Sequence, residues 1–265
     1  PETLEAAARA VEAAALPAKG ITQVEAAAAY SRRALHLAAT NGFSGGYGRT
    51  STSLSAVAFT GQGTDMQRDY AGESRVYAAD MPDARGIGEL AAERTLQRVG
   101  SVKPRTGTFP VLYDERVASS LIGHLLSAIN GISIARGSSW ARDLLGKPVL
   151  PRGLSLIEDP HRPRISSSRP FDGEGLATRR RAIVEDGVLT GWVLDLATGR
   201  KLGLPSTANA SRGTGAPPSP ATTNIDLTQG AVTRDDLLAQ MGTGLWVTSM
   251  IGSTINPTTG DYSRG

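Results

Sequence analysis

Two carboxylates separated by one residue form the most suggestive acidic pair in this chain of 265 residues. Asp172 and Glu174 lie in the segment Phe171-Asp172-Gly173-Glu174-Gly175, whose glycines predict a flexible loop. Such a pair can perform general acid–base catalysis when burial separates the pKa values of the two groups. The alternative interpretation, which the residue types favour, is a capped turn with both carboxylates exposed to water.

Metal-ligating side chains are scarce. The chain has three histidines, His36, His124 and His161, and no cysteine. Neither His36 nor His124 has a second histidine or an acidic residue at the spacing that a helix needs to present two ligands, and His161 is predicted to lie in a loop. Because a zinc site in a protein usually takes at least three ligands from His, Cys, Asp or Glu, only an assembly of all three histidines is left open. The absence of cysteine also excludes disulfides and thiolate chemistry.

Two polar, glycine-containing loops could form a surface for a peptide or a partner protein. One is Arg136-Gly137-Ser138-Ser139, and the other runs from Asn209 through Arg212 to Gly215. The arginines could hold a carboxylate through forked hydrogen bonds that lysine does not reproduce. An ordinary solvated loop is the alternative for each residue. Together with the acidic pair, the candidate binding residues are Arg136, Ser138, Ser139, Asp172, Glu174, Asn209 and Arg212.

Other well-known site motifs are missing. The sequence contains no phosphate-binding loop, no dinucleotide fingerprint, no G-x-S-x-G elbow and no S-x-x-K motif. The glycine-rich segment 42–48 has no helix behind it and is interpreted as a mobile turn. With 28 basic and 25 acidic residues, the charge excess is small, and the one basic triplet, Arg179-Arg180-Arg181, is typical of a solvated strand. Nucleic-acid binding is therefore not favoured.

The first part of the chain alternates helices and strands. Apolar spacing predicts a helix over 2–15, strands over 29–39, 53–60 and 66–76, and a helix over 84–98. Asn41-Gly42 predicts a turn of the chain, and 61–65 predicts a hairpin turn. A linker over 100–106, which contains Lys103-Pro104, is the best domain boundary.

The second part is predicted to be richer in strands. A strand over 108–113 precedes a helix with Asp114 as its N-cap, and this helix ends at Asn130-Gly131. Asp186-Gly187 predicts a tight turn between two strands within 181–195, with Val184 and Val188 flanking the turn. A strand over 223–228, a helix over 233–241 with Thr233 as its N-cap, and a strand over 245–251 follow. The fold class is α+β, with few helices, antiparallel hairpin-rich sheets and a β-rich C-terminal half.

Composition places the chain among soluble globular proteins. Hydrophobic residues make up 40% and charged residues 20%, and no apolar run reaches the length of a membrane helix. Without a signal segment or cysteine, we expect a cytoplasmic protein that does not bind membranes. The chain begins at Pro1 without Met and stops at Gly265, so we expect a fragment of a longer protein.

Six segments, in this order, resemble the TldD/PmbA family, and specifically its PmbA (TldE) branch. They are NGFSGGYGRTSTSLSAVA, the strand Met66-Gln67-Arg68-Asp69-Tyr70, HLLSAINGISIARGSSW, SRPFDGEG, VEDGVLTGWVLDLATGRKLG and NPTTGDYSRG. The resemblance extends from about Gly20 to Gly265. It implies that residues 1–105 are an α+β middle domain and residues 106–265 a β-rich C-terminal domain, both from a protein that continues beyond each end of this chain.

The resemblance also implies an activity. The family is a cytoplasmic metallopeptidase system that trims and matures peptides, and it was once labelled a modulator of DNA gyrase. Its TldD branch carries H-E-x-x-x-H on a helix that binds zinc, which polarises a carbonyl and activates water. Matching that helix through the following R-G-S-S loop places Ile122, Gly123 and Ser127 at the His, Glu and His positions. The chain therefore resembles the branch that lacks these ligands.

These implications give the functional expectation. The chain would be a pseudoenzyme that binds no cofactor and pairs with a TldD-type catalytic subunit, which carries the zinc, around a peptide substrate. A homodimer in isolation is left open. Two alternatives are a metal-free hydrolase that uses Asp172 and Glu174, and a protein that binds peptide or nucleic acid without any proteolytic role.

Overall fold

The computed structural model describes residues 1–252 and 254–263, so Arg264 and Gly265 of the last resembling segment lie outside the described residues. Within the described part, six α-helices and thirteen strands form the predicted α+β fold, and all strand pairs except β4–β11 are antiparallel. The chain divides into two compact units. The first comprises 1–105 with 164–166, and the second comprises 106–163 with 167–265.

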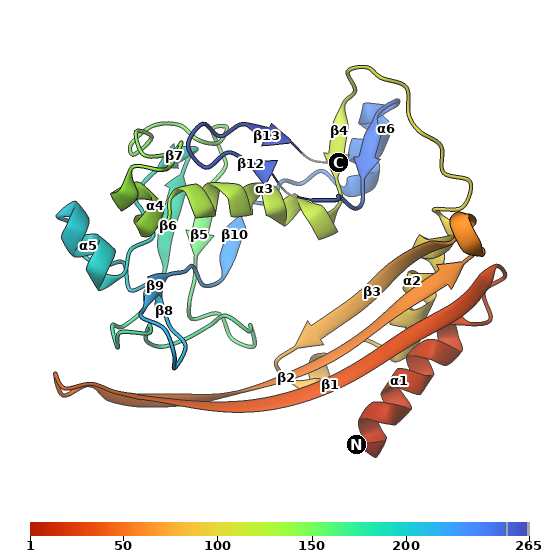
Figure 1. Ribbon diagram of the computed structural model, residues 1–265, viewed down its shortest axis with the longest axis horizontal. Helices are drawn as coiled ribbons and strands as arrows, with labels where there is room; N and C mark the ends of the chain where they lie inside the picture. Colours follow the sequence, from red (N-terminus) through yellow and green to blue (C-terminus); the bar gives the residue numbers. More distant parts are fainter. Residues whose placement is uncertain (253, 264–265) are drawn as a thin grey trace. The chain divides into compact units, whose positions relative to one another are not determined.

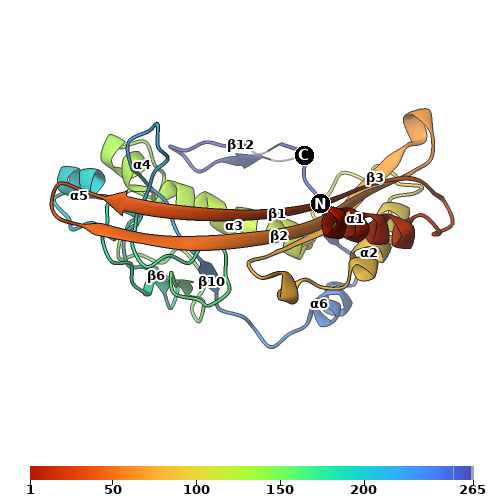
Figure 2. The ribbon, with the colours of Figure 1, turned by 90° about the horizontal axis from the view of Figure 1, so that it is seen from below.

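The first unit is a three-stranded sheet of order β1-β2-β3 with two helices against it (Figures 1 and 2). Its elements are α1 (Glu2–Ala15), β1 (Ile21–Ala38), β2 (Ser44–Thr60), β3 (Gln67–Arg75) and α2 (Ala84–Leu96), with short 3-10 turns at Gly63–Asp65 and Ala78–Asp80. The predictions for both helices, for β3 and for the turn before it are confirmed.

Small side chains bring the two helices of this unit close together. Val11 and Ala15 of α1 are completely buried against Ala91 and its neighbours in α2. A Cβ atom on Gly88 would lie 2.2 Å from the carbonyl oxygen of Val11, so only glycine fits at this crossing. The alanine-rich pattern of the sequence is therefore a packing feature of the unit's core.

Strands β1 and β2 are much longer than predicted. The first strand begins at Ile21 rather than at residue 29, and the segment 42–48, interpreted as a mobile turn, is mostly the start of β2. Cross-strand pairing satisfies the backbone groups of this glycine-rich segment. The glycines also allow a close approach, since a Cβ on Gly46 would lie 2.8 Å from the Leu35 carbonyl oxygen. The predicted turn at Asn41-Gly42 is confirmed, with the Gly42 N–H donating to the Ala39 carbonyl.

The second unit combines a small sheet with four helices and three strand pairs. The sheet has the order β10-β5-β6-β7, and the pairs are β4–β11, β8–β9 and β12–β13. Its elements are β4 (Val111–Tyr113), α3 (Glu115–Ala128), α4 (Gly131–Arg136), β5 (Leu156–Glu158), β6 (Arg181–Glu185), β7 (Val188–Leu189), α5 (Leu196–Leu202), β8 (Ala210–Ser211), β9 (Ser219–Pro220), β10 (Ile225–Leu227), α6 (Arg234–Met241), β11 (Leu245–Val247), β12 (Thr254–Ile255) and β13 (Tyr262–Ser263).

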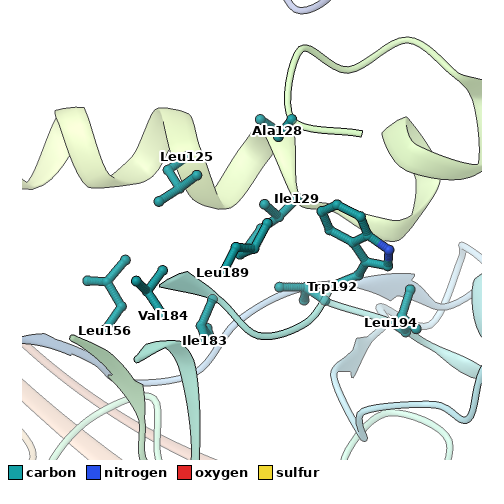
Figure 3. Close-up of a cluster of buried hydrophobic side chains, with 11 residues drawn as sticks. Leu125, Ala128, Ile129, Leu156, Ile183, Val184, Leu189, Trp192 and Leu194 are labelled. Atoms are coloured by element: carbon teal, nitrogen blue, oxygen red, sulfur yellow. The ribbon is translucent and has the colours of Figure 1, made fainter. Parts of the chain in front are cut away.

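The core of this unit lies between α3 and the sheet. Figure 3 shows Leu125 and Ala128 of α3 above Val184 of β6 and Leu189 of β7, with Trp192 closing one side. Helix α3 starts where the sequence predicts, because the Asp114 carboxylate accepts a hydrogen bond from the Arg116 N–H. Thr233 caps α6 in the same way, as predicted.

Two helices of this unit were not predicted. Asn130 was predicted only to end a helix. It is also the N-cap of α4, because its side-chain oxygen accepts a hydrogen bond from the Ile132 N–H. Asp195, predicted to end a strand, is the N-cap of α5 and forms a capping box with Thr198. The predicted second strand of the 181–195 hairpin is correspondingly shorter, at Val188–Leu189, and β11 ends at Val247 rather than at residue 251.

The Asp186-Gly187 turn between β6 and β7 is confirmed. Both residues have positive φ, 46° and 82°, which is the geometry of a type I′ hairpin turn. The pair that flanks the turn is Glu185 with Val188, and Val184 pairs with Leu189 instead, so the expected flanking pair of Val184 and Val188 is wrong by one position.

Replacing Gly187 with valine is expected to destabilise the second unit by about 3 kcal/mol, from left-handed backbone strain and overpacking together. A Cβ here would lie 2.5 Å from the Leu150 carbonyl oxygen, and φ is 82°. Urea unfolding followed by tryptophan fluorescence measures the loss. Gly203→Val is the control, since Gly203 has a φ of 69° but open space around its Cβ position. Equal losses in the two variants would mean that the collision with Leu150 does not exist.

No helix of the described residues is long enough to span a bilayer. The longest, α1 and α3, have 14 residues each, whereas a membrane-spanning helix needs about 20 residues.

Candidate functional site

Helix α3 carries the three positions that the resembling family would use for zinc. Ile122 packs against the buried cluster, Gly123 has no side chain, and Ser127 is exposed. None of them offers an imidazole, carboxylate or thiolate, the ligands that zinc takes in proteins. Across the described residues, no group of three or more His, Cys, Asp or Glu side chains is arranged to hold a metal ion. The residues at these three positions of α3 do not fit zinc.

Each of the three histidines has its own contacts. His36 lies in β1, with its Nε2 3.1 Å from the Ser44 hydroxyl, and His161 lies in a loop, with its Nε2 3.1 Å from the Thr178 hydroxyl. His124 projects from α3 and packs edge-on against the Tyr262 ring at 5.1 Å. Its Nε2 is buried and finds no hydrogen-bond partner within the part of the chain that the structure describes. None of these contacts joins one histidine to another.

Asp172 has a structural role. Its side chain is 2% exposed, so the interpretation as a water-exposed turn is wrong for this residue. One carboxylate oxygen accepts from the N–H groups of Glu174 and Leu176, both at 2.9 Å, and the other accepts from the Ala210 N–H at 3.0 Å. The Asp172 carboxylate thus accepts three backbone hydrogen bonds, and these connect the loop 171–176 to Ala210 of β8.

Glu174 is half-buried and contacts the start of α5. Its Oε2 accepts from the Leu196 N–H at 2.9 Å, in the first turn of that helix. Burial raises the pKa of the Glu174 carboxyl above its usual range, and the nearby carboxylates of Asp172 and Asp195 act in the same direction. The Leu196 N–H and Arg200 oppose this rise in pKa. Among the seven candidates, Glu174 therefore has the environment that most resembles that of a catalytic acid.

A buried ion pair lies beside these loops, and the sequence analysis did not identify it. Glu158 of β5 is 2% exposed, and its Oε2 accepts from Nε of Arg181 in β6 at 2.9 Å. Its other oxygen accepts from the Asn209 side-chain amide and from the Thr223 N–H, both at 2.7 Å. The guanidinium of Arg181 also donates to the Trp192 carbonyl and to the Asn209 side-chain oxygen, both at 3.1 Å. Both oxygens of Glu158 accept hydrogen bonds in this network, and each of the three guanidinium nitrogens of Arg181 donates one.

This network removes two residues from the surfaces proposed for binding. Asn209 is 2% exposed, and both ends of its amide are engaged by Glu158 and Arg181. Arg181, the last residue of the basic triplet, is an inward-facing strand residue. The sequence contains one signal of this orientation. Arg181 precedes Ile183 by two residues, and residues two apart in a strand lie on the same face, which for Ile183 is buried.

The remaining candidates differ in accessibility. Ser139 is buried, and its hydroxyl donates to the Ala128 carbonyl at 2.6 Å and accepts from the Ala141 N–H at 3.0 Å. Ser138 is half-buried after α4, whereas Arg136 is exposed in the last turn of that helix. Arg212 is exposed after β8 and packs beside Gly173, where a Cβ would lie 3.2 Å from its Cγ.

The structure thus divides the seven candidates into two neighbourhoods. Asp172, Glu174, Asn209 and Arg212 gather around β8, and Arg136, Ser138 and Ser139 lie at the C-terminal end of α4. Only Arg136, Ser138, Glu174 and Arg212 retain surface that a ligand could reach.

An open hollow of about 410 Å³ lies elsewhere in the second unit and was not identified from the sequence. The N-terminal ends of α3 and α6 line it, and the Arg234 guanidinium lies 5.5 Å above the Trp246 ring. Asp114 is the N-cap of α3, where its carboxylate accepts from the Arg116 N–H, and Thr233 is the N-cap of α6, where its hydroxyl accepts from the Asp236 N–H. None of the seven candidates lines this hollow.

Comparison with family models matches both parts of the chain. Residues 1–99 match the PmbA/TldA metallopeptidase central domain, and residues 106–265 match the PmbA/TldA metallopeptidase C-terminal domain. These matched ranges leave 100–105 between them.

Individual relatives agree with the family models. The chain is 38% identical over its full length to the metalloprotease PmbA of Escherichia coli O157:H7, of which it covers 57%. It is 41% identical to a PmbA homologue of Haemophilus influenzae over 68% of this chain and 38% of that protein. The chain therefore spans about half the length of these relatives.

Solved structures resemble the whole chain. A protein of Bacteroides thetaiotaomicron, described as a candidate modulator of DNA gyrase, superposes with a TM-score of 0.91 and 30% identity, covering 100% of this chain and 58% of that one. TldE of Thermococcus kodakarensis superposes with a TM-score of 0.85 over 100% of this chain and 60% of that one, and at 19% identity it shows a shared fold.

Proposed function

The chain belongs to the PmbA/TldD metallopeptidase family, in its PmbA branch, and we propose that it is the non-catalytic subunit of a two-subunit peptidase. A TldD-type partner would hold the zinc, and this chain would complete the cavity in which a peptide is cleaved. The observation that carries the proposal lies on α3. The family resemblance places Ile122, Gly123 and Ser127 at the His, Glu and His positions of the zinc-binding helix, and none of the three can hold a metal ion.

The buried polar residues support the same proposal. Asp172, Asn209 and Ser139 use their side chains to hold loops together, and this leaves little catalytic machinery to assign. The exposed arginines, Arg136 and Arg212, are the residues that we assign to a peptide carboxylate or to acidic groups of the partner, since a guanidinium binds carboxylates with two parallel hydrogen bonds. We place this activity in the cytoplasm.

The alternatives have weaker support. A metal-free hydrolase would need Asp172 as a second catalytic carboxylate, but three backbone N–H groups already engage it. Nucleic-acid binding through the basic triplet would need Arg181, which is paired with Glu158. We therefore propose a single function for this chain, that of the non-catalytic subunit of a two-subunit peptidase.

Zinc analysis and sedimentation test the proposal. The full-length form of this protein, purified gently, is expected to contain well under one zinc per chain, because a structural or catalytic site takes at least about three protein ligands. Mixed with the TldD-type subunit of the same organism, it is expected to sediment as a heterodimer that contains the partner's zinc. The matched control is the partner with its two zinc-binding histidines replaced by alanine, which should leave the pair without zinc. One tightly held zinc on this chain alone, or no complex, would contradict the proposal.

A further inference from the structure

The strands β1 and β2 extend well past β3 as a two-stranded ribbon (Figures 1 and 2). We call residues 30–51 the arm. Strand β3 pairs with β2 only from Thr52 to Thr60, so no third strand accompanies the arm within the described residues. A two-stranded hairpin is marginally stable by itself in water, and free strand edges favour pairing with other chains. A long ribbon of this kind is expected to gain stability from a surface that covers it.

The arm carries the charge excess of the chain. It contains three arginines, Arg32, Arg33 and Arg49, and no acidic residue, whereas the whole chain has 28 basic and 25 acidic residues. The rest of the chain is therefore balanced in charge. Arg33 and Arg49 lie directly opposite each other in the β1–β2 register. Like charges in this position destabilise a strand pair, and carboxylates from another molecule would remove that repulsion.

Apolar side chains follow the two arginines along the same face. Because side chains alternate along a strand, Arg33 and Leu35 share one face, and their partners across the ribbon are Arg49 and Tyr47. Leu35 is 45% exposed, and the Arg49 guanidinium lies 5.6 Å from the centre of the Tyr47 ring. Arginine and tyrosine beside an exposed leucine are typical of the centre of a protein interface. Binding to nucleic acid rests mainly on contacts between basic side chains and phosphates, so it does not explain the exposed leucine.

We propose that this face of the arm is the docking surface for an acidic patch on the TldD-type subunit. The inference rests on the proposed function, because it uses the same partner. The positive charge of the arm carries it, since the arm holds three arginines and no acidic residue. The length fits as well, because nine residues of β1 and eight of β2 lie in the arm, and at about 3.4 Å each they give a face about 30 Å long, the scale of a contact between two folded proteins.

Charge reversal on the arm tests the inference. Full-length Arg33→Glu and Arg33→Glu/Arg49→Glu are compared with the wild type in binding to the TldD-type subunit, measured by titration calorimetry at low and high salt. In Arg33→Glu the new carboxylate faces Arg49, an attractive cross-strand pair that keeps the arm folded. The matched control is Arg152→Glu/Arg179→Glu, which makes the same charge change at two exposed arginines of the second unit.

The expected result is a loss of affinity of about fivefold for the single variant and at least about tenfold for the double variant, mainly through a slower association, with the control within about twofold. Because surface charges are screened by salt, the difference between wild type and variants is expected to shrink as salt rises.

Other results separate the two proposals. If the wild type forms a complex and the double variant binds equally tightly, the inference about the arm is wrong while the proposed function stands. If the wild type forms no complex, the proposed function fails and the inference fails with it. Sedimentation of each variant alone and anisotropy with a 20-base-pair DNA duplex check other occupants. Loss of self-association or of DNA binding, with affinity for the partner unchanged, would overturn the proposal.

Discussion

Replacing Arg181 with alanine is expected to lower the free energy of unfolding of the second unit by about 3–5 kcal/mol, because it leaves a buried carboxylate without its partner. Glu158 is 2% exposed, and its remaining hydrogen bonds would come from the Asn209 side-chain amide and from Thr223. The Trp192 carbonyl and the Asn209 side-chain oxygen would also lose a donor. All three tryptophans of the chain, Trp140, Trp192 and Trp246, belong to the second unit, so tryptophan fluorescence during urea unfolding measures its stability.

The neighbouring arginine provides the matched control. Arg180 is 65% exposed and lies 3.7 Å from the Asp159 carboxylate, so Arg180→Ala is expected to cost less than about 1 kcal/mol. A second variant, Glu158→Gln/Arg181→Met, removes both charges and is expected to recover part of the loss, since a buried pair is costly mainly when one partner is missing. If the alanine variants at 180 and 181 were equally stable, the ion pair with Glu158 would not form.

Local signals in the sequence predicted several elements correctly. Asp114 and Thr233 mark helix starts because a side-chain oxygen there satisfies a backbone N–H within the next three residues. Asp186-Gly187 marks a hairpin turn because both positions need positive φ. Such features depend on a few neighbouring residues, so a single sequence is enough to find them.

Long-range pairing accounts for the errors. The segment around Gly46 is rich in glycine and has little strand propensity of its own, and it forms a strand because β1 pairs with it along its whole length. The capped helix α5 was missed because its cap, Asp195, follows an apolar run that reads equally well as a strand.

The candidate site shows the same difference between features that depend on local sequence and features that depend on long-range contacts. The residue types at 122, 123 and 127 of α3 could be read from the sequence, and none of these three is a usual zinc ligand. The accessibility of the loop residues could not be inferred, because Asn209 and Asp172 are buried by partners 51 and 38 residues away. The sequence therefore identified which groups are present and misjudged which of them face solvent.

The hydrogen bonds of Asp172 and Glu174 determine which of the two carboxylates can be replaced to test catalysis by this chain. Asp172→Asn would place an amide NH₂ or a weaker acceptor where three backbone N–H groups converge, so a loss of activity would report on folding. Glu174→Gln keeps an oxygen that can accept from the Leu196 N–H and removes only the charge. Glu174 is also the reachable carboxylate of the pair, which makes it the informative position.

Peptide turnover by the reconstituted pair is the most direct test of the account. The full-length form of this protein and its TldD-type partner are mixed, and cleavage of a peptide is measured for the wild-type pair, for partner histidine→alanine variants and for Glu174→Gln in this chain. The account predicts that neither subunit is active alone and that the histidine variants lose at least about 1,000-fold in rate, since bound zinc contributes several kcal/mol to catalysis. Glu174→Gln is expected to stay within about twofold of the wild-type pair, because it removes no group that touches the reacting atoms. Loss of turnover in Glu174→Gln, with assembly and peptide binding unchanged, would show instead that this chain supplies a catalytic group.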